Sequence, residues 1–115
     1  MSFRVIFTPA ARRQELEQAD AMDRSPAGPN LTDRWLDAVA TVLESLAETP
    51  HARPLCLDPA AEGTGLREAY VKIGRRKPHR LIFRIDADTV TVLLVWPTAL
   101  GDFAAGDLPA GADSR

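Results

Sequence analysis

Three stretches of strand-like sequence follow one another in the second half of the chain, and they constrain the fold more than any other feature. They run from Leu66 to Ile73, from Arg80 to Ile85 and from Thr89 to Trp96. Short runs rich in Val, Ile, Leu and Thr, bounded by Gly, Pro and Asp, are typical of β-strands. The two connections, Gly74 to Pro78 and Asp86 to Asp88, are short. We therefore expect an antiparallel meander.

A strand and a helix are predicted at the N-terminus. Residues Phe3 to Phe7 alternate in hydrophobicity, which favours a strand with its apolar face on the core. Thr8 is a typical N-cap, and Pro9 suits the first helical position that follows it. The next segment, Ala10 to Met22, consists mostly of good helix formers. Because it has few large apolar side chains, this helix needs a neighbour to be stable.

A second helix is predicted from Leu31 to Glu48, and its signal is the strongest helix signal in the chain. Asn30 is a candidate cap before it, and Thr49-Pro50 ends it. Apolar residues recur at helical spacing along this segment: Leu31, Trp35, Val39, Val42, Leu43 and Leu46. We expect Trp35 to anchor the core.

The order of these elements is β-α-α-β-β-β, which predicts the α+β class. Two consecutive helices followed by a meander exclude a doubly wound parallel sheet. We expect one twisted antiparallel sheet with a two-helix hairpin packed on one face, and the first strand at an edge or beside the last strand. The 115 residues fit a single domain, predicted over residues 1–103. Residues 51–65 are irregular, and residues 104–115 are predicted to be a disordered tail.

The composition excludes several functional classes. Cys56 is the only cysteine, so no intramolecular disulfide can form, and His51 and His79 have no thiolate partners at metal-ligand spacing. The sequence contains no glycine-rich phosphate loop with a following lysine and no G-x-S-x-G motif. We expect no metal and no cofactor. The N-terminus lacks an apolar stretch long enough for a signal peptide or a membrane span, which favours a cytoplasmic protein without membrane association.

The net charge of −2 hides a segregated basic block. Seven basic residues and one acid, Glu68, lie in the interval 67–84, which therefore carries +6 and leaves −8 on the rest of the chain. A segregated block favours a polyanionic or acidic partner. A solvated, charged hairpin with no partner is the alternative. The seven basic residues are Arg67, Lys72, Arg75, Arg76, Lys77, Arg80 and Arg84.

The alternation of the middle strand divides its side chains between two faces of the sheet. Leu81, Phe83 and Ile85 should meet the helices. Arg80, Ile82 and Arg84 then point toward an open face. Arginine holds phosphate or carboxylate oxygens bidentately, so an RNA backbone or an acidic protein segment would suit this face. His79 precedes Arg80 and is a candidate general acid or base. A hairpin residue without a catalytic role fits the sequence equally well.

Six motifs occur in an order and at a spacing that resemble a known family. They are Phe3 to Ala11, Arg53 to Leu55, Gly65 to Glu68, Tyr70 to Gly74, His79 to Asp86 and Val90 to Val95. Together they resemble the RelE/ParE superfamily of type II toxins, which are also known as plasmid stabilisation proteins. The resemblance covers the chain from Phe3 to about Trp96. It implies the same order of elements and a cognate antitoxin, with which the toxin would form a hetero-oligomer.

The resemblance implies one of two activities that arrest growth. RelE-like members cleave mRNA on the ribosome without a metal, and Lys72 and Arg80 match their lysine and central arginine. ParE-like members inhibit DNA gyrase. The RelE pattern also places a basic residue and a tyrosine or histidine after the last strand, but residues 97–112 contain no Lys, Arg, His or Tyr. Without such residues, one of the two proton transfers in RNA cleavage has no side chain to carry it out, unless His79 acts as the acid or base.

ParE-like gyrase inhibition is therefore the favoured function. The first alternative is a metal-independent, ribosome-dependent endoribonuclease with Lys72, Arg80 and His79 as catalytic residues. The second alternative is an inactive member that only binds its antitoxin. In each active case the target, which is gyrase or the ribosome with its mRNA, would contact basic side chains. The candidates are Arg67, Arg75, Arg76, Lys77 and Arg84.

Overall fold

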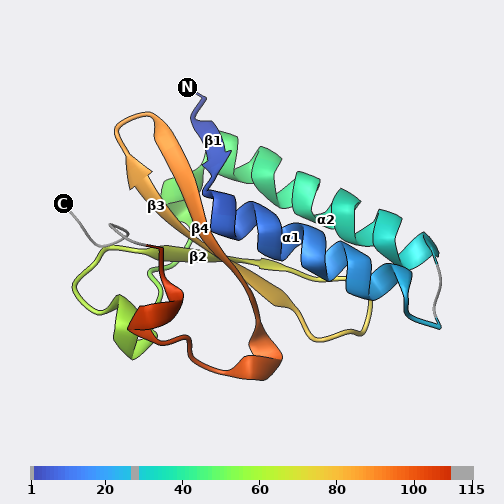
Figure 1. Cartoon of the computed structure of the whole chain (residues 1–115). Helices are drawn as coiled ribbons and strands as arrows, with labels where there is room; N and C mark the ends of the chain where they lie inside the picture. The colour runs from blue at the N-terminus through green and yellow to red at the C-terminus, as the bar shows by residue number, and fades with distance from the viewer. Residues whose placement is uncertain (1, 27–28, 110–115) are drawn as a thin grey trace.

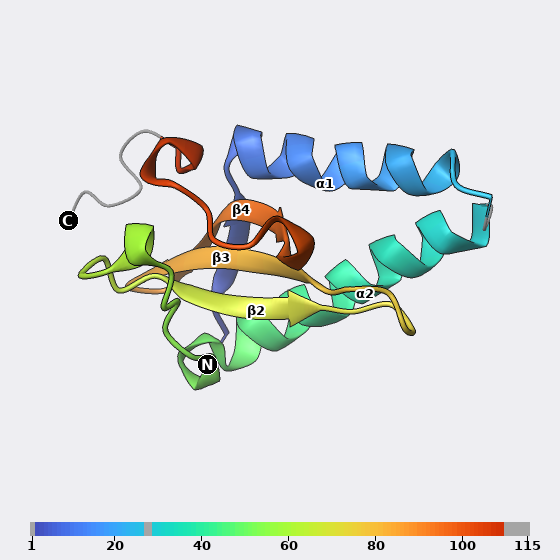
Figure 2. The ribbon, with the colours of Figure 1, turned by 90° about the horizontal axis from the view of Figure 1, so that it is seen from below.

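The computed structural model describes residues 2–26 and 29–109. Its main elements follow the predicted order, and the α+β class is confirmed. The elements are β1 (Arg4–Phe7), α1 (Pro9–Asp23), α2 (Pro29–Glu48), β2 (Arg67–Val71), β3 (His79–Asp86) and β4 (Thr89–Pro97). The two helices form a hairpin: they lie close together near the connection between them and diverge toward their other ends (Figure 1 and Figure 2). Within the described residues, no helix has the length and apolarity that a bilayer crossing requires.

The sheet has the strand order β1-β4-β3-β2. β2, β3 and β4 form the predicted antiparallel meander. β1 lies beside the last strand, which is one of the two placements expected for it, but it runs parallel to β4 and makes the sheet mixed. Backbone groups on the outer edge of β4 are satisfied in this way, because Arg4 N donates to Asp88 O at 2.8 Å and Thr8 N donates to Val92 O at 3.0 Å.

The two helices begin differently. In α1, Thr8 Oγ1 accepts a hydrogen bond from Ala11 N at 3.1 Å, and Pro9 occupies the first turn, as predicted. α2 begins at Pro29, so Asn30 lies inside the helix and the prediction that it caps the helix is wrong. The fixed φ of proline suits the first helical position, which explains why the helix starts before Asn30.

Trp35 is the centre of the core between the helices and the sheet. Its side chain is fully buried, and its Nε1 donates to Glu15 O in α1 at 3.3 Å. Its ring centroid lies 4.7 Å from that of His79 in β3. One side chain therefore ties α2 to α1 and to the sheet. The other buried members of this cluster are Ala11, Met22, Leu31, Val39, Leu46, Ala69, Val71, Ile73, Leu81, Phe83, Val90, Val92 and Val95.

A second apolar cluster covers the opposite face of the sheet, the face that the alternation of the middle strand predicts to be open. Ile82 of β3 and Leu94 of β4 are fully buried there. The cover comes from residues 54–66, including the 3₁₀ helix Pro59–Ala61, and from the segment that follows β4. The prediction of a wet basic face is therefore wrong. The buried members are Cys56, Ala61, Leu66, Ile82, Leu93, Leu94 and Phe103.

The chain after β4 packs against this second cluster. Phe103 is buried, a 3₁₀ helix spans Ala105–Asp107, and Leu108 contacts the cluster. Packed chain thus continues into residues 104–108, the first part of the predicted tail. The last part of that predicted tail, residues 110–115, lies outside the described residues.

The core position of Trp35 leads to a first expectation. Trp35→Ala removes a fully buried indole, and we expect it to lower the free energy of unfolding by about 3–5 kcal/mol. Leu16→Ala is the matched control, because Leu16 is 54% exposed on α1 and its truncation should change stability by less than about 0.5 kcal/mol. Chemical denaturation followed by circular dichroism measures both values. Equal midpoints for Trp35→Ala and the wild type would contradict the assignment of this anchor.

Candidate functional site

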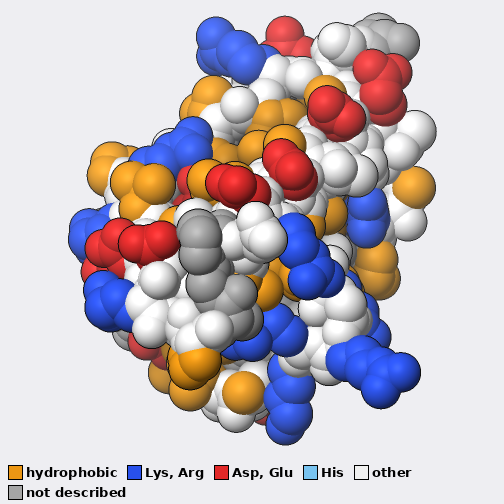
Figure 3. All heavy atoms as spheres, turned by 90° about the vertical axis from the view of Figure 1, so that its right-hand side faces the viewer, with side chains coloured by type: hydrophobic (Ala, Val, Ile, Leu, Met, Phe, Trp, Pro, Cys, Tyr) orange, Lys and Arg blue, Asp and Glu red, His pale blue; other side chains and the backbone are white. Residues whose placement is uncertain are grey.

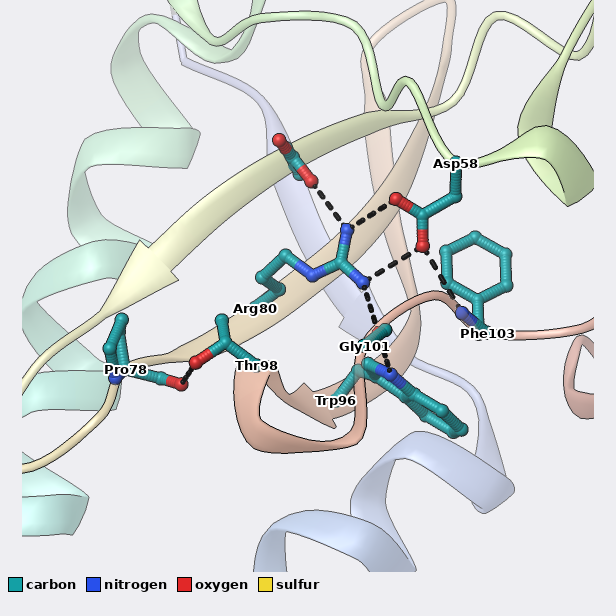
Figure 4. Close-up of polar contacts among 8 residues, drawn as sticks. Asp58, Pro78, Arg80, Trp96, Thr98, Gly101 and Phe103 are labelled. Atoms are coloured by element: carbon teal, nitrogen blue, oxygen red, sulfur yellow. Dashed lines mark hydrogen bonds and ion pairs between the residues drawn. The ribbon is translucent and has the colours of Figure 1, made fainter.

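Arg80 lies in the middle of the sheet face that the second cluster covers. Its side chain is buried, and the residue is 6% exposed. Nη1 donates to Asp58 Oδ1 at 2.8 Å and Nη2 donates to Asp58 Oδ2 at 2.9 Å, which is a bidentate pair (Figure 4). Nη1 also donates to Glu68 Oε1 at 2.9 Å, and Nη2 donates to Gly101 O at 3.2 Å. The guanidinium is thus surrounded by partners from three segments of the chain.

The chain around these partners is held by further hydrogen bonds (Figure 4). Asp58 Oδ2 accepts from Phe103 N at 3.1 Å, and Gly101 O accepts from Trp96 Nε1 at 2.8 Å. Gly101 has a φ of 73°, a conformation that glycine adopts without strain and that allows the turn after β4. Residues 97–103 and the segment around Asp58 are therefore fastened to each other and to Arg80.

We define the ion cluster as Arg80, Asp58 and Glu68, and its central pair, Arg80 with Asp58, favours the charged forms of both side chains. The hydrogen bond from Arg80 lowers the pKa of Asp58 despite its burial. The same pair raises the pKa of Arg80 above its ordinary value. Two carboxylates against one guanidinium give the cluster a formal charge of −1. Arg80 consequently presents no net positive charge to an approaching anion.

A donor set for a metal ion lies at the same place. Among the described residues, one donor atom each of Cys56, Asp58 and Glu68 lies within 4.8 Å of the others. Both carboxylates already bind Arg80, and burial raises the pKa of the Cys56 thiol, which keeps it protonated. A metal ion would have to displace the guanidinium and take a proton from the thiol. The set fits a structural ion pair better than a metal centre.

His79 lies on the other face of the sheet from Arg80. Its Nε2 is hydrogen-bonded to Gln18 Oε1 of α1 at 2.9 Å, and its ring packs on Trp35. Burial lowers the pKa of His79, and the charge of Arg76 lowers it further. Neighbouring residues of a strand point to opposite faces, so the structure does not bring His79 and Arg80 into one site.

The remaining candidate catalytic residue, Lys72, is exposed just beyond the end of β2. A shallow hollow of about 280 Å³ lies over the ion cluster on the face that Arg80 occupies. Tyr70, which is opposite Arg80 in the sheet register, lines this hollow. Lys72 does not line it.

The predicted binding arginines and lysine divide into two groups. Arg67 donates to Arg53 O at 2.6 Å, and Arg84 forms an ion pair with Asp86 at 2.7 Å. Arg75, Arg76 and Lys77 are exposed together in the turn between β2 and β3. Lys and Arg side chains gather in the lower right of Figure 3, on the end of the molecule where this turn lies.

Two residues that complete these arrangements were not found from the sequence. Asp58 lies in the stretch predicted to be irregular, 22 residues before Arg80, and no motif marks it as the partner. Arg34 of α2 joins the turn, because its Nη2 would lie 3.0 Å from a β-carbon placed on Gly74. The sequence gives no sign of this, since the nearest charged neighbours of Arg34 in the chain, Asp33 and Asp37, are acidic.

The ion cluster leads to a second expectation. Arg80→Ala leaves the charges of the buried Asp58 and the half-buried Glu68 uncompensated, and we expect it to reduce the free energy of unfolding by about 3–5 kcal/mol. Arg75→Ala removes an exposed arginine from the same hairpin and should change stability by less than about 0.5 kcal/mol. Urea denaturation of the two variants distinguishes the roles. Equal loss in both, or in neither, would show that the cluster does not stabilise the fold.

His79 leads to an expectation about pH. Because its pKa in the folded protein is below 6.5, the unfolded chain takes up a proton at a higher pH than the folded chain does. The contribution of His79 to the free energy of unfolding is therefore fully present above pH 6.5, and it is lost as the pH decreases through the pKa that His79 has in the folded protein. In His79→Gln this slope should disappear, as measured by urea denaturation between neutral and mildly acidic pH. An identical slope in the variant would rule out His79 as its source.

Comparisons with known proteins identify the family. The family described as the ParE toxin of the type II toxin-antitoxin system, parDE, matches residues 5–99. A solved chain of the chromosomal ParDE toxin–antitoxin system from P. aeruginosa is similar in fold, with a TM-score of 0.63 at 14% identity, over 84% of this chain and 96% of that chain. No curated protein matches. Because the family match spans most of the sequence, the chain belongs to the ParE family, the toxin component of type II toxin–antitoxin systems.

Proposed function

We propose that this ParE-family toxin arrests growth by binding to DNA gyrase and inhibiting it, without covalent chemistry of its own. The observation that carries the proposal is the state of Arg80, whose guanidinium is buried and bound by two carboxylates. Family membership implies that a cognate antitoxin neutralises the toxin and that the two assemble into a hetero-oligomer. We propose gyrase as the target and the cytoplasm as the place where the toxin acts.

The positions of the candidate catalytic residues argue against the ribonuclease alternative. Cleavage by a ribose 2′-hydroxyl needs a base, an acid and a positive charge near the phosphate. Arg80 is enclosed in a cluster of formal charge −1, which would repel a phosphate. His79 packs between the helices and the opposite face of the sheet. Of the three residues, this leaves only Lys72 free to meet RNA.

Purified toxin tests the proposal directly. We expect supercoiling by gyrase to stop in excess toxin and to recover when the cognate antitoxin is added. Supercoiling that continues in excess folded toxin would overturn the proposal. In the cell, induced toxin should arrest growth with a DNA damage response and with intact ribosome-bound mRNA.

The ribonuclease alternative needs a variant that does not disturb the core. Arg80→Ala is unsuitable, because lost toxicity would follow from lost stability as readily as from lost catalysis. Lys72→Ala changes an exposed side chain and should leave the fold intact. Codon-phased mRNA cuts that appear with wild-type toxin and vanish with Lys72→Ala would establish the ribonuclease. Growth that continues unaffected by soluble, folded wild-type toxin would instead indicate an inactive antitoxin-binding member.

A further inference from the structure

The turn between β2 and β3 carries a concentration of positive charge that the structure leaves uncompensated. We call Arg34, Arg75, Arg76 and Lys77 the basic tip. All four are exposed, and they come from α2 and from the turn. In the described part of the chain, none of them forms an ion pair, whereas Arg80 and Arg84 do. The sequence from residue 69 to residue 85 contains no acidic residue.

The backbone of the turn has a defined conformation. Gly74 has a φ of 54°, which favours glycine, and Arg76 N donates to Ile73 O at 3.1 Å. The guanidinium of Arg34 lies close against Gly74, where a β-carbon would meet its Nη2 at 3.0 Å. The absence of a side chain at Gly74 therefore lets a cation from the helix approach the three cations of the turn.

A hollow lies beside the basic tip. Its volume is about 360 Å³, and Arg76, Lys77 and His79 line it together with Pro78, Pro97 and Ala99. Burial lowers the pKa of His79, and the charge of Arg76 lowers it further, so a cation lies beside the imidazole at this hollow. The hollow is large enough for a phosphate group, and its walls offer two cationic side chains.

We propose that the basic tip binds the phosphate backbone of duplex DNA, an inference that rests on the proposed function because a gyrase inhibitor meets the DNA that gyrase holds. Phosphate contacts require cations and no apolar surface. The turn fits this requirement, since its one large apolar residue, Ile73, is buried.

A protein partner that binds through apolar contacts would find a more suitable surface at another place on the molecule. There Leu55 and the 88% exposed Leu57 border an open cavity. The charge of −8 outside the basic block opposes DNA contact over the rest of the surface.

Fluorescence anisotropy with a short labelled duplex tests this inference without gyrase. The full chain is compared with the triple variant Arg75→Ala/Arg76→Ala/Lys77→Ala. Each lost phosphate contact should reduce the slope of log K against log salt by about 0.9, so the slope should fall by up to about 2.7. At low salt we expect the variant to bind at least about tenfold more weakly. The variant's circular dichroism and urea midpoint should match the wild type, because the three side chains are exposed.

A second triple variant, Arg4→Ala/Arg13→Ala/Arg24→Ala, removes the same charge from exposed positions on β1, on α1 and just after α1. It should bind the duplex like the wild type. An equal loss in both variants would show that net charge matters and not the basic tip, and this would overturn the inference. Wild-type toxin that fails to bind the duplex at low salt would do the same.

Two further ligands test the choice of partner. Single-stranded RNA of equal length, or polyglutamate, bound more tightly than the duplex through the same three residues would overturn the assignment to DNA. The gyrase assay separates this inference from the proposed function. Inhibition of gyrase by toxin that binds no DNA would refute only the role of the basic tip. Binding of DNA by toxin that leaves supercoiling unaffected would refute only gyrase inhibition.

Discussion

The bidentate contact between Arg80 and Asp58 connects the centre of the sheet to two segments that have no regular structure of their own. Asp58 belongs to the 54–66 segment, and its second oxygen also accepts from Phe103 N in the chain after β4. Burial of such charges is costly unless every partner is placed well. Here Asp58 lies between Cys56 and Ala61 of the second apolar cluster in the chain, and it also binds the backbone of Phe103, another member of that cluster. The ion cluster and the apolar cover on Ile82 and Leu94 therefore depend on each other.

A sheet covered on both faces leaves the ends and edges of the molecule for partners. The exposed apolar side chains Leu55 and Leu57 lie by the irregular segment, and the basic tip lies at the turn between β2 and β3. These surfaces differ in chemistry, since one offers apolar contact and the other offers charge alone. A toxin that acts by binding needs surfaces of this kind, whereas a ribonuclease needs an open catalytic face. The architecture is in keeping with the first type of action.

Two features of the site could have been inferred from the sequence by a stricter use of strand geometry. His79 has the same parity as Leu81, which was assigned to the helix side, so its separation from Arg80 follows from the period of two. The unbroken apolar run Val92–Trp96 in β4 indicates a strand buried on both faces, because a half-exposed strand alternates with polar residues. The pairing of Arg80 with Asp58 carries no such signal. It joins residues 22 positions apart through a segment without periodicity.

The class and order of the elements, the meander, the cap at Thr8 and the core role of Trp35 could all be predicted from the sequence, because each of them depends on local periodicity or on the chemistry of a single position. The parallel pairing of β1, the burial of Arg80 and the approach of Arg34 to Gly74 become visible only in the folded chain. These features join residues that are distant in the chain. Their free energy comes from desolvation and packing in the assembled fold, which no short window of sequence contains.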